Sequence, residues 1–212
     1  TRYEVVGEEP AAVDVEPVVS AYREKFGEAP PTDPKDLCWC RHVSEYVTRY
    51  LRQLHDHLKA SGRPVELAVG IPGIAPLGDE PLVRCGADWR RWVEERLVDT
   101  LVINHVTWDR KAPLESTQAA YREVLCTVAG RCRVWCPVQQ YNYSTYGIPA
   151  YQEATGKKPE ELAEALTRLA HQAGAHGISL ECVDYNNYSP AVRDALRRLT
   201  SGACRQVKSI GE

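Results

Sequence analysis

The chain has 212 residues, 43% of them hydrophobic, which is enough for one substantial core, and we expect a single domain over residues 1–212. Its 26 basic and 29 acidic residues give a net charge of −3 and form no long run of one sign. This balance argues against nucleic acid or a membrane surface as a partner. In addition, no apolar stretch approaches the roughly 20 residues that span a bilayer.

Two helices are predicted ahead of any strand. The first covers residues 14–26 and ends at Gly27, shortly before a proline-rich stretch. The second covers residues 39–60, where apolar side chains recur every three or four positions. These side chains belong to Val43, Tyr46, Val47, Tyr50, Leu51, Leu54 and Leu58. Residues 1–64 are therefore expected to be a loop and two helices in front of the sheet.

Residues 65–205 are predicted to hold four β-α units. Each unit has a short apolar run, then a polar or aromatic loop, then an amphipathic helical stretch, which is the order found in parallel sheets. The apolar runs are 65–72, 98–104, 133–140 and 176–184. The helical stretches begin at Asp88 and continue with 114–129, 158–173 and 190–201. Parallel sheets place their chemistry at the carboxyl ends of the strands, so the loops that follow the four runs are the expected site.

Alternation within the strands favours a barrel over a doubly wound sheet. In the first strand one face is apolar (Val65, Leu67, Val69, Ile71), whereas the other is small or polar (Glu66, Ala68, Gly70). A doubly wound sheet is covered on both faces and reads as a continuous apolar run. A barrel has an inner face that becomes polar at its mouth. Because four strands cannot close alone, we expect residues ahead of Thr1 or another chain to complete the barrel.

The same alternation brings polar side chains together at the mouth of the expected barrel. Asn104, Gln139 and Glu181 end the second, third and fourth strands on the inner face. Four aromatic residues lie on the loops just beyond, namely Trp108, Tyr141, Tyr143 and Tyr146. Amides and carboxylates bind sugar hydroxyl groups while aromatic rings stack on sugar C–H faces, so this set resembles a carbohydrate site. The aromatic rings would equally serve as a cover for the barrel end.

Four stretches of the chain resemble the glycosyl hydrolase-like 10 family, bacterial glycosidases with a TIM-barrel fold. They are EYVTRYLRQLHDHL (45–58), ELAVGIPG (66–73), GADWRRWVEERLVDTLVIN (86–104) and AGAHGISLECVDYNN (173–187). The third is the most specific, since Gly-x-Asp-x-x-x-Trp-x-x-x-x-Leu-Val-Asp before a strand is characteristic of that family. The resemblance implies an α/β fold of TIM (β/α)8 type, in which this chain supplies strands five to eight. It also implies that Arg2 lies just beyond the fourth strand and contacts substrate.

The resemblance implies hydrolysis of a glycosidic bond by carboxyl groups, with no cofactor. Such hydrolysis normally needs two carboxyl groups, about 5–5.5 Å apart for retention or roughly 6.5–9.5 Å for inversion. Glu181 is the strongest candidate, Asp184 and Asp109 follow on mouth loops, and His105 would orient or protonate the substrate. Many barrel glycosidases carry an acid at the end of the seventh strand, but here that strand ends in Val138-Gln139-Gln140. This departure leaves the second carboxylate unassigned.

Two other functions remain open from the residues. One is a carbohydrate-binding barrel without catalysis, in which the second carboxylate is truly absent. The other is a metal-assisted lyase or isomerase with four ligands, His105, Asp109, Glu181 and Asp184. The metal reading ranks last because these residues form no pair at helical or strand spacing. We therefore expect no metal, and we expect a carbohydrate as the ligand.

Several chemically capable residues have structural interpretations. Asp88 suits a helix cap, and Asp99 and Glu66 lie at the amino ends of strands, the stability face of a barrel. Three histidines lie on the predicted long helix, where packed or solvated roles are expected (His42, His55, His57). The eight cysteines form no Cys-x-x-Cys, and Cys136 and Cys182 fall on apolar strand faces. Unpaired thiols favour a reducing compartment, although a chain that begins at Thr1 without methionine leaves the location unassigned.

Overall fold

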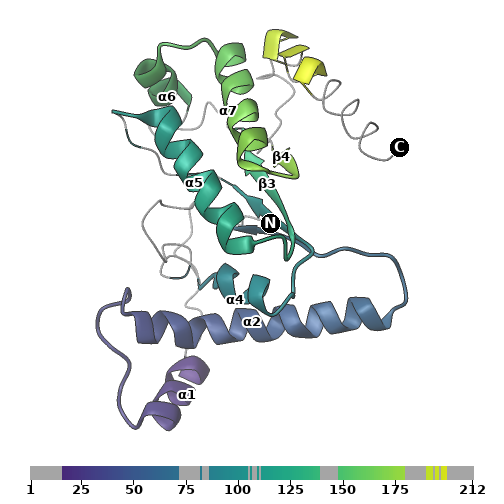
Figure 1. The fold of residues 1–212 in the computed structure, drawn as a ribbon. Coiled ribbons are helices and arrows are strands. Elements are labelled where there is room, and N and C mark those ends of the chain that lie inside the picture. The colour runs from purple at the N-terminus through teal and green to yellow at the C-terminus, as the bar shows by residue number, and fades with distance from the viewer. Residues whose placement is uncertain are drawn as a thin grey trace.

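The computed structural model describes residues 16–71, 82, 86–104, 106, 109, 111–138, 148–179, 190–192, 194–195 and 197–199. Within these ranges helices and strands alternate after two leading helices (Figure 1). The elements are α1 (Glu16–Phe26), α2 (Leu37–Ala60), β1 (Ala68–Ile71), α4 (Trp89–Glu94), β2 (Thr100–Ile103), α5 (Pro113–Val128), β3 (Arg133–Pro137), α6 (Ile148–Thr155), α7 (Pro159–Ala173) and β4 (Gly177–Ser179). The predicted order is confirmed as far as β4, and α6 is an addition to the predicted elements.

The four strands form one parallel sheet in the order β1-β2-β3-β4. Gly70 pairs with Val102, Val102 with Trp135, and Trp135 with Gly177, so these four residues form one row across the sheet. Strands that follow one another along the chain are therefore neighbours, as in consecutive β-α units. This arrangement is compatible with a fragment of a TIM barrel.

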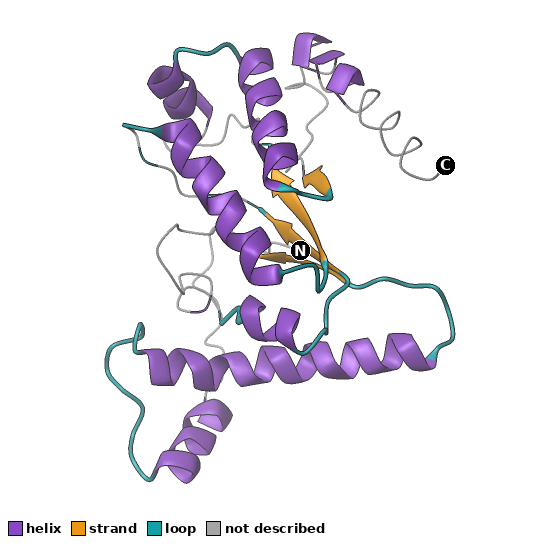
Figure 2. Cartoon of the chain, in the orientation of Figure 1, coloured by secondary structure: helices purple, strands orange, loops and turns teal. Residues whose placement is uncertain are grey.

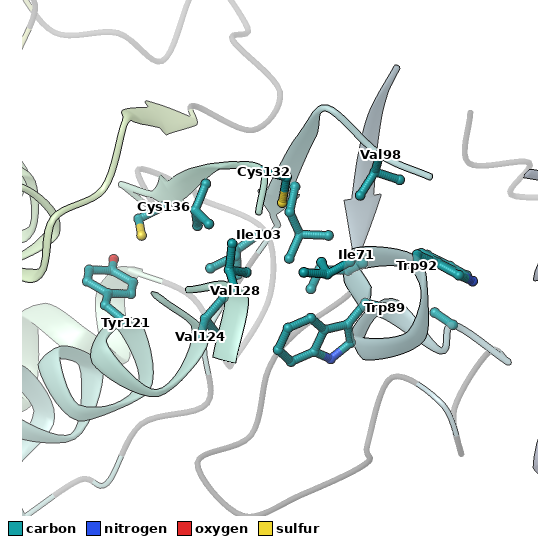
Figure 3. Close-up of a cluster of buried hydrophobic side chains, with 14 of the residues drawn as sticks. Ile71, Trp89, Trp92, Val98, Ile103, Tyr121, Val124, Val128, Cys132 and Cys136 are labelled. Carbon is teal, nitrogen blue, oxygen red and sulfur yellow. The ribbon is translucent and has the colours of Figure 1, made fainter. Parts of the chain in front are cut away.

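The helices cover one face of the sheet (Figure 2). On that face Leu101, Ile103, Val134 and Cys136 are fully buried, in one cluster with residues of α4, α5 and α7. Figure 3 shows Ile103 and Cys136 beside Tyr121 and Val124 of α5. On the opposite face Ala68 and Gly70 are exposed, and the Trp135 side chain remains 40% exposed. Burial alternates as predicted in β1 and at Leu101 to Ile103 and Val134 to Cys136, whereas Thr100 and Pro137 are buried although they have the parity of the opposite face, and β4 is half-buried throughout. We call the second face, formed by Ala68, Gly70, Val102, Trp135, Gly177 and Ser179, the open face.

Helices α5 and α7 begin and end at sequence signals. Each has proline in its first turn, where a missing N–H costs nothing. Ala129 follows the last residue of α5 and Gly174 that of α7, and both adopt the left-handed conformation that closes helices. The Tyr121 hydroxyl on α5 donates to the Pro137 carbonyl at 2.5 Å, which ties this helix to the end of β3. These contacts fix the carboxyl end of β3 against the helical layer.

Helix α2 begins at Leu37, two residues earlier than expected, because Asp36 caps it. The Asp36 carboxylate accepts from the backbone N–H groups of the next turn. The buried residues of α2 are Cys40, His42, Ser44, Thr48 and Leu51, so small and polar side chains dominate the buried line. Tyr50 was expected within an apolar stripe, but it is 63% exposed. Helix α2 is held instead by polar partners on α4. The spacing of apolar residues along α2 does not reveal these partners.

His42 is a packed histidine, as expected. Its Nε2 lies 3.0 Å from the Val18 carbonyl oxygen, which can only accept, so Nε2 donates. Rings from α1 and α2 surround it: Tyr22, Phe26, Trp39 and Tyr46. This aromatic cluster joins α1 to α2, and it explains the histidine without metal or catalysis.

Helix α4 is held on α2 by one buried hydrogen bond and one ionic network. The Trp92 indole N–H donates to the Thr48 hydroxyl at 2.9 Å, and both side chains are buried. Nearby, Arg52 binds both carboxylate oxygens of Glu95, at 2.6 and 2.8 Å. Arg91 donates to Glu95 at 2.8 Å and also pairs with Glu45. The two arginines and two glutamates thus connect two helices that are distant in sequence.

This network predicts acid sensitivity. Hydrogen bonding from Arg52, with a further contribution from Arg91, lowers the pKa of Glu95 from 4.5 to about 2. Because the folded pKa lies below the unfolded one, the stabilisation is complete above about pH 4.5 and is lost as the pH falls towards 2. We expect Glu95→Gln to remove this part of the pH dependence, at a cost of about 1 kcal/mol at neutral pH given the partial exposure.

Urea unfolding at a series of pH values measures this effect. The matched control is Glu94→Gln, the exposed acid next to Glu95 on α4, which should leave the pH profile of the wild type unchanged. Equal acid sensitivity in wild type and Glu95→Gln would contradict the assigned role of the network.

The described part of the chain holds no helix that is long and apolar enough to cross a membrane. Within that part, histidine, cysteine and acidic side chains gather into no cluster of three that suits a metal ion. Cys132 and Cys136 are buried free thiols, and Cys136 lies on the apolar strand face as expected. Burial raises the pKa of the Cys136 thiol to about 12. Cys182 lies outside the described residues.

Candidate functional site

The carboxyl ends of the parallel strands lie along one edge of the sheet, and Asn104 occupies that edge after β2. Its backbone N–H donates to the Ile71 carbonyl at 3.0 Å, which extends the β1–β2 ladder by one step. Its side chain lies over Gly70, where an added Cβ would stand 3.2 Å from Asn104 Oδ1. Asn104 therefore points to the open face, as its parity with Thr100 and Val102 predicted.

Asp109, the second predicted site residue that the structure describes, shapes the turn before α5. Its carboxylate accepts from the Lys111 N–H at 2.9 Å, and its own N–H donates to the Ser116 hydroxyl at 2.9 Å. The residue is exposed. One carboxylate oxygen is thus engaged in the turn, which gives Asp109 a structural task whatever its chemistry.

The remaining predicted site residues lie outside the described residues. They are Glu181, Asp184 and His105 among the catalytic candidates, and Arg2, Trp108, Gln139, Tyr141, Tyr143 and Tyr146 among the substrate contacts. The described structure therefore brings none of them together with Asn104, and their arrangement stays a prediction.

The sheet bends towards its open face at the carboxyl edge. The Ser179 hydroxyl on β4 donates to the Ile103 carbonyl on β2 at 3.0 Å, although β3 lies between these strands in the sheet. The β2–β3 pairing ends at Val102 and Trp135, so β3 has diverged from β2 at this level. A sheet that brings alternate strands into contact is strongly curved, as barrel strands are.

Trp135, on β3, is not among the site residues that are expected from the sequence. Its indole lies across Gly177, where an added Cβ would stand 2.9 Å from Trp135 Cδ1 and 3.0 Å from Nε1. Trp135 has the same strand parity as Gln139, so alternation assigns both residues to one face. Trp135 lies in mid-strand, whereas the expected ligand contacts lie at the carboxyl ends of the strands and on the loops beyond them.

The glycine beneath Trp135 gives a direct test. We expect Gly177→Val to push the indole off the sheet and to cost about 1–2 kcal/mol of unfolding free energy, because the added atoms overpack the row. In a Trp135→Ala background the same substitution should be nearly neutral. Denaturant unfolding of the four proteins in this double-mutant cycle measures the coupling. Equal costs in both backgrounds would show that the Trp135–Gly177 contact is not formed.

The amino end of the open face is held by ion pairs, not by free acids. Glu66 pairs with Arg133, whose Nε also donates to the Thr100 hydroxyl at 3.2 Å. On the adjoining loop Asp99 accepts from the Leu67 N–H at 2.8 Å and pairs with Lys59 at 3.5 Å. Both acids thus have structural partners at the amino ends of the strands, which fits the structural interpretation of these two residues.

Comparison with known protein families matches residues 7–133 to glycosyl hydrolase-like 10, more than half of the chain. Comparison with curated proteins finds no match, and comparison with solved structures finds none. The matched residues run from the first residues of the chain to the start of β3. The resembling stretch at 173–187 lies beyond them.

Within the matched residues, the characteristic pattern has a structural role at several positions. Gly86 adopts a positive φ of 65°, which glycine tolerates best. Asp88 caps α4, Trp92 binds Thr48 on α2, and Asp99 caps the entry to β1. The residues of the pattern therefore form the contacts that connect α2, α4 and the sheet. It specifies an architecture more than a reaction.

Proposed function

Because the chain belongs to the glycosyl hydrolase-like 10 family, we propose that it forms the part of a carbohydrate-active TIM barrel that holds strands five to eight. Strands β1 to β4 would be those strands, in the same order. The reaction would be hydrolysis of a glycosidic bond at the carboxyl edge of the sheet, where barrel enzymes carry their active sites.

The position of Asn104 is the observation that carries this proposal. Its amide lies at the carboxyl edge, points to the open face and is half-buried, which suits a group that binds a sugar hydroxyl. The register of β3 with β4 pairs Pro137 with Ser179. Two residues further along, the same parity assigns Gln139 and Glu181 to the open face as neighbours, and we propose that they join Asn104 in one polar set.

In this proposal Glu181 is the acid, base or nucleophile, and a second carboxylate completes the pair. Asp109 has one oxygen engaged by the Lys111 N–H, which favours Asp184 for the second role. The aromatic residues Trp108, Tyr141, Tyr143 and Tyr146 would stack on the sugar ring, with Arg2 and His105 at the rim. A separation of about 5–5.5 Å between the carboxyl groups would give retention, and roughly 6.5–9.5 Å would give inversion.

A carbohydrate-binding barrel without catalysis is the second candidate. The observation in its favour is the make-up of the open face: the described residues of β1 to β4 include no acid, and Glu66, just ahead of β1, pairs with Arg133. A barrel whose mouth holds one carboxylate would bind sugars through amides and aromatic rings, and it would not hydrolyse them.

Two assays on the same protein separate these functions. Aryl glycosides of varied sugar and anomeric configuration report hydrolysis by release of the phenolate. Titration with the corresponding free sugars, followed by tryptophan fluorescence, reports binding. Hydrolysis supports the first proposal, and saturable binding without hydrolysis supports the second. The absence of both signals over the whole panel would overturn both.

A further inference from the structure

The indole of Trp135 lies flat on the open face of the sheet. A Cβ added at Gly177 would stand 2.9 Å from Cδ1, 3.0 Å from Nε1 and 3.3 Å from Cγ of Trp135, which are three consecutive atoms of the five-membered ring. An edge-on approach would leave at least one of these atoms much farther away than the others. The similar distances therefore mean that one ring face meets the glycine. The opposite ring face points away from the sheet, and Trp135 is 40% exposed.

The row of residues that contains Trp135 leaves room above the sheet. The row consists of Gly70, Val102, Trp135 and Gly177. In a (β/α)8 barrel, bulky branched side chains usually fill the inward-pointing strand positions, but here two of the four positions have no side chain. Trp135 leans over one glycine and Asn104 leans over the other, on opposite sides of Val102. The open face thus carries an aromatic ring and an amide where a packed core would carry aliphatic groups.

We propose that Trp135 is a stacking platform of the carbohydrate site, on which one pyranose ring of the ligand lies with its C–H face, and that Gly177 keeps this platform flat. The inference rests on the proposed function and adds a mid-strand residue to it. The indole suits the task because its face is large and apolar. By the strand register, Asn104 lies two residues nearer the carboxyl edge on the same face, where its amide would bind a hydroxyl group of the same ligand.

Trp135 lies near enough to the carboxyl edge for a ligand to reach it from there. Strand β3 pairs Pro137 with Ser179, the last residue of β4. Trp135 lies two residues before Pro137, which is about 7 Å along a strand, a depth comparable with the size of one sugar ring. The amino end of the face is occupied by the ion pair between Glu66 and Arg133. The ligand would therefore enter from the carboxyl edge, where the polar set of the proposed site lies.

Acrylamide quenching of tryptophan fluorescence tests whether the platform is accessible. The difference between wild type and Trp135→Phe isolates the emission of Trp135, because the other tryptophans are common to both proteins. We expect this emission to be readily quenched in the free protein and protected at saturating concentrations of a free sugar from the panel. A Trp135 that is already shielded in the free protein would overturn the proposal, because no sugar could then reach the ring.

Isothermal titration calorimetry, with the sugar of the panel that binds wild type most tightly, measures the contribution of the ring. Trp135→Ala is expected to raise the dissociation constant about tenfold or more, because the ligand no longer covers an aromatic face. Gly177→Ala keeps the indole but places a Cβ 2.9 Å from it, so it should also weaken binding. Tyr50→Ala is the matched control, since this tyrosine is 63% exposed on α2, and its affinity should equal that of wild type.

The outcomes separate this inference from the proposed function. Unaltered affinity of Trp135→Ala, in a variant that far-UV circular dichroism shows to be folded, would overturn the platform and leave the carbohydrate function in place. A wild type that neither binds nor hydrolyses any sugar of the panel would overturn the proposed function, and the platform with it. Weaker binding by both Trp135→Ala and Gly177→Ala, with Tyr50→Ala unchanged, would support the platform.

Discussion

Replacing Glu181 with glutamine is expected to lower the turnover of a hydrolysed aryl glycoside by about 10²–10⁴-fold, the range over which general acid–base groups act. Glutamine keeps the size and the hydrogen-bonding shape of the side chain, but it can neither exchange a proton nor attack the anomeric carbon. Substrate binding should change far less than turnover. Steady-state kinetics on the best substrate of the glycoside panel measures both.

The control for this experiment is Glu115→Gln, the same chemical change at an exposed position in the first turn of α5. It should leave turnover unchanged. Added azide provides a further distinction, because a small external nucleophile can replace a missing carboxylate in a retaining site but not a missing structural group. Turnover by Glu181→Gln equal to that of the wild type would remove Glu181 from the proposed mechanism.

Trp92→Ala is expected to destabilise the protein by about 3–5 kcal/mol, the usual cost of deleting a buried aromatic side chain. Trp92 is 2% exposed and packs in the main core, and its N–H is bonded to the buried Thr48 hydroxyl. The substitution leaves a cavity and also an unsatisfied hydroxyl between α2 and α4. Urea unfolding measures the loss, which for a chain of this size should lower Tm by roughly 10 °C.

Two milder variants separate packing from hydrogen bonding. Trp92→Phe keeps most of the ring but loses the donor, and Thr48→Val loses the acceptor. Each alone should cost about 1–2 kcal/mol, and the double variant should cost less than their sum, because neither polar group is then left unpaired. Strict additivity would show that the hydrogen bond between Trp92 and Thr48 contributes nothing.

The strand faces could be predicted from the sequence because side-chain direction in a strand alternates with a period of two. That rule alone placed Ile71, Ile103 and Cys136 against the helices, and it placed Asn104 on the open face. Burial of one face then enforces the register. Information of this kind is local, and a single sequence carries it.

Helix α2 shows where local information ends. Apolar spacing counted Tyr50 into the buried stripe, while Ser44 and Thr48 are the residues that lie inside. Thr48 is buried where its hydroxyl accepts a hydrogen bond from the indole of Trp92, 44 residues later in the chain. The spacing of apolar residues within α2 carries no information about a partner that lies so far along the chain. Helix α6 is not among the predicted elements for another reason. Its eight residues are too few for a clear amphipathic pattern, although Pro149 in its first turn is a start signal.

Among the candidate site residues, alternation predicts the face on which Asn104 lies, whereas spacing gives no sign of the role of Asp109 in the turn before α5. Loop residues obey no period, so their positions relative to one another depend on turn geometry that spacing does not encode. For that reason the mouth residues of the four loops could be proposed as a set, but not as an arrangement.

The rate at which the buried Cys136 thiol is labelled is expected to measure local opening of the protein. Only the thiolate reacts with maleimides, and burial both shields Cys136 and raises its pKa to about 12. Cys38 and Cys126 are exposed and should label at once. Labelling of Cys136 should wait until β3 leaves α5, so its rate follows the population of opened molecules. Mass spectrometry of the labelled protein over time would then measure how often β3 separates from α5, with no residue of the chain replaced.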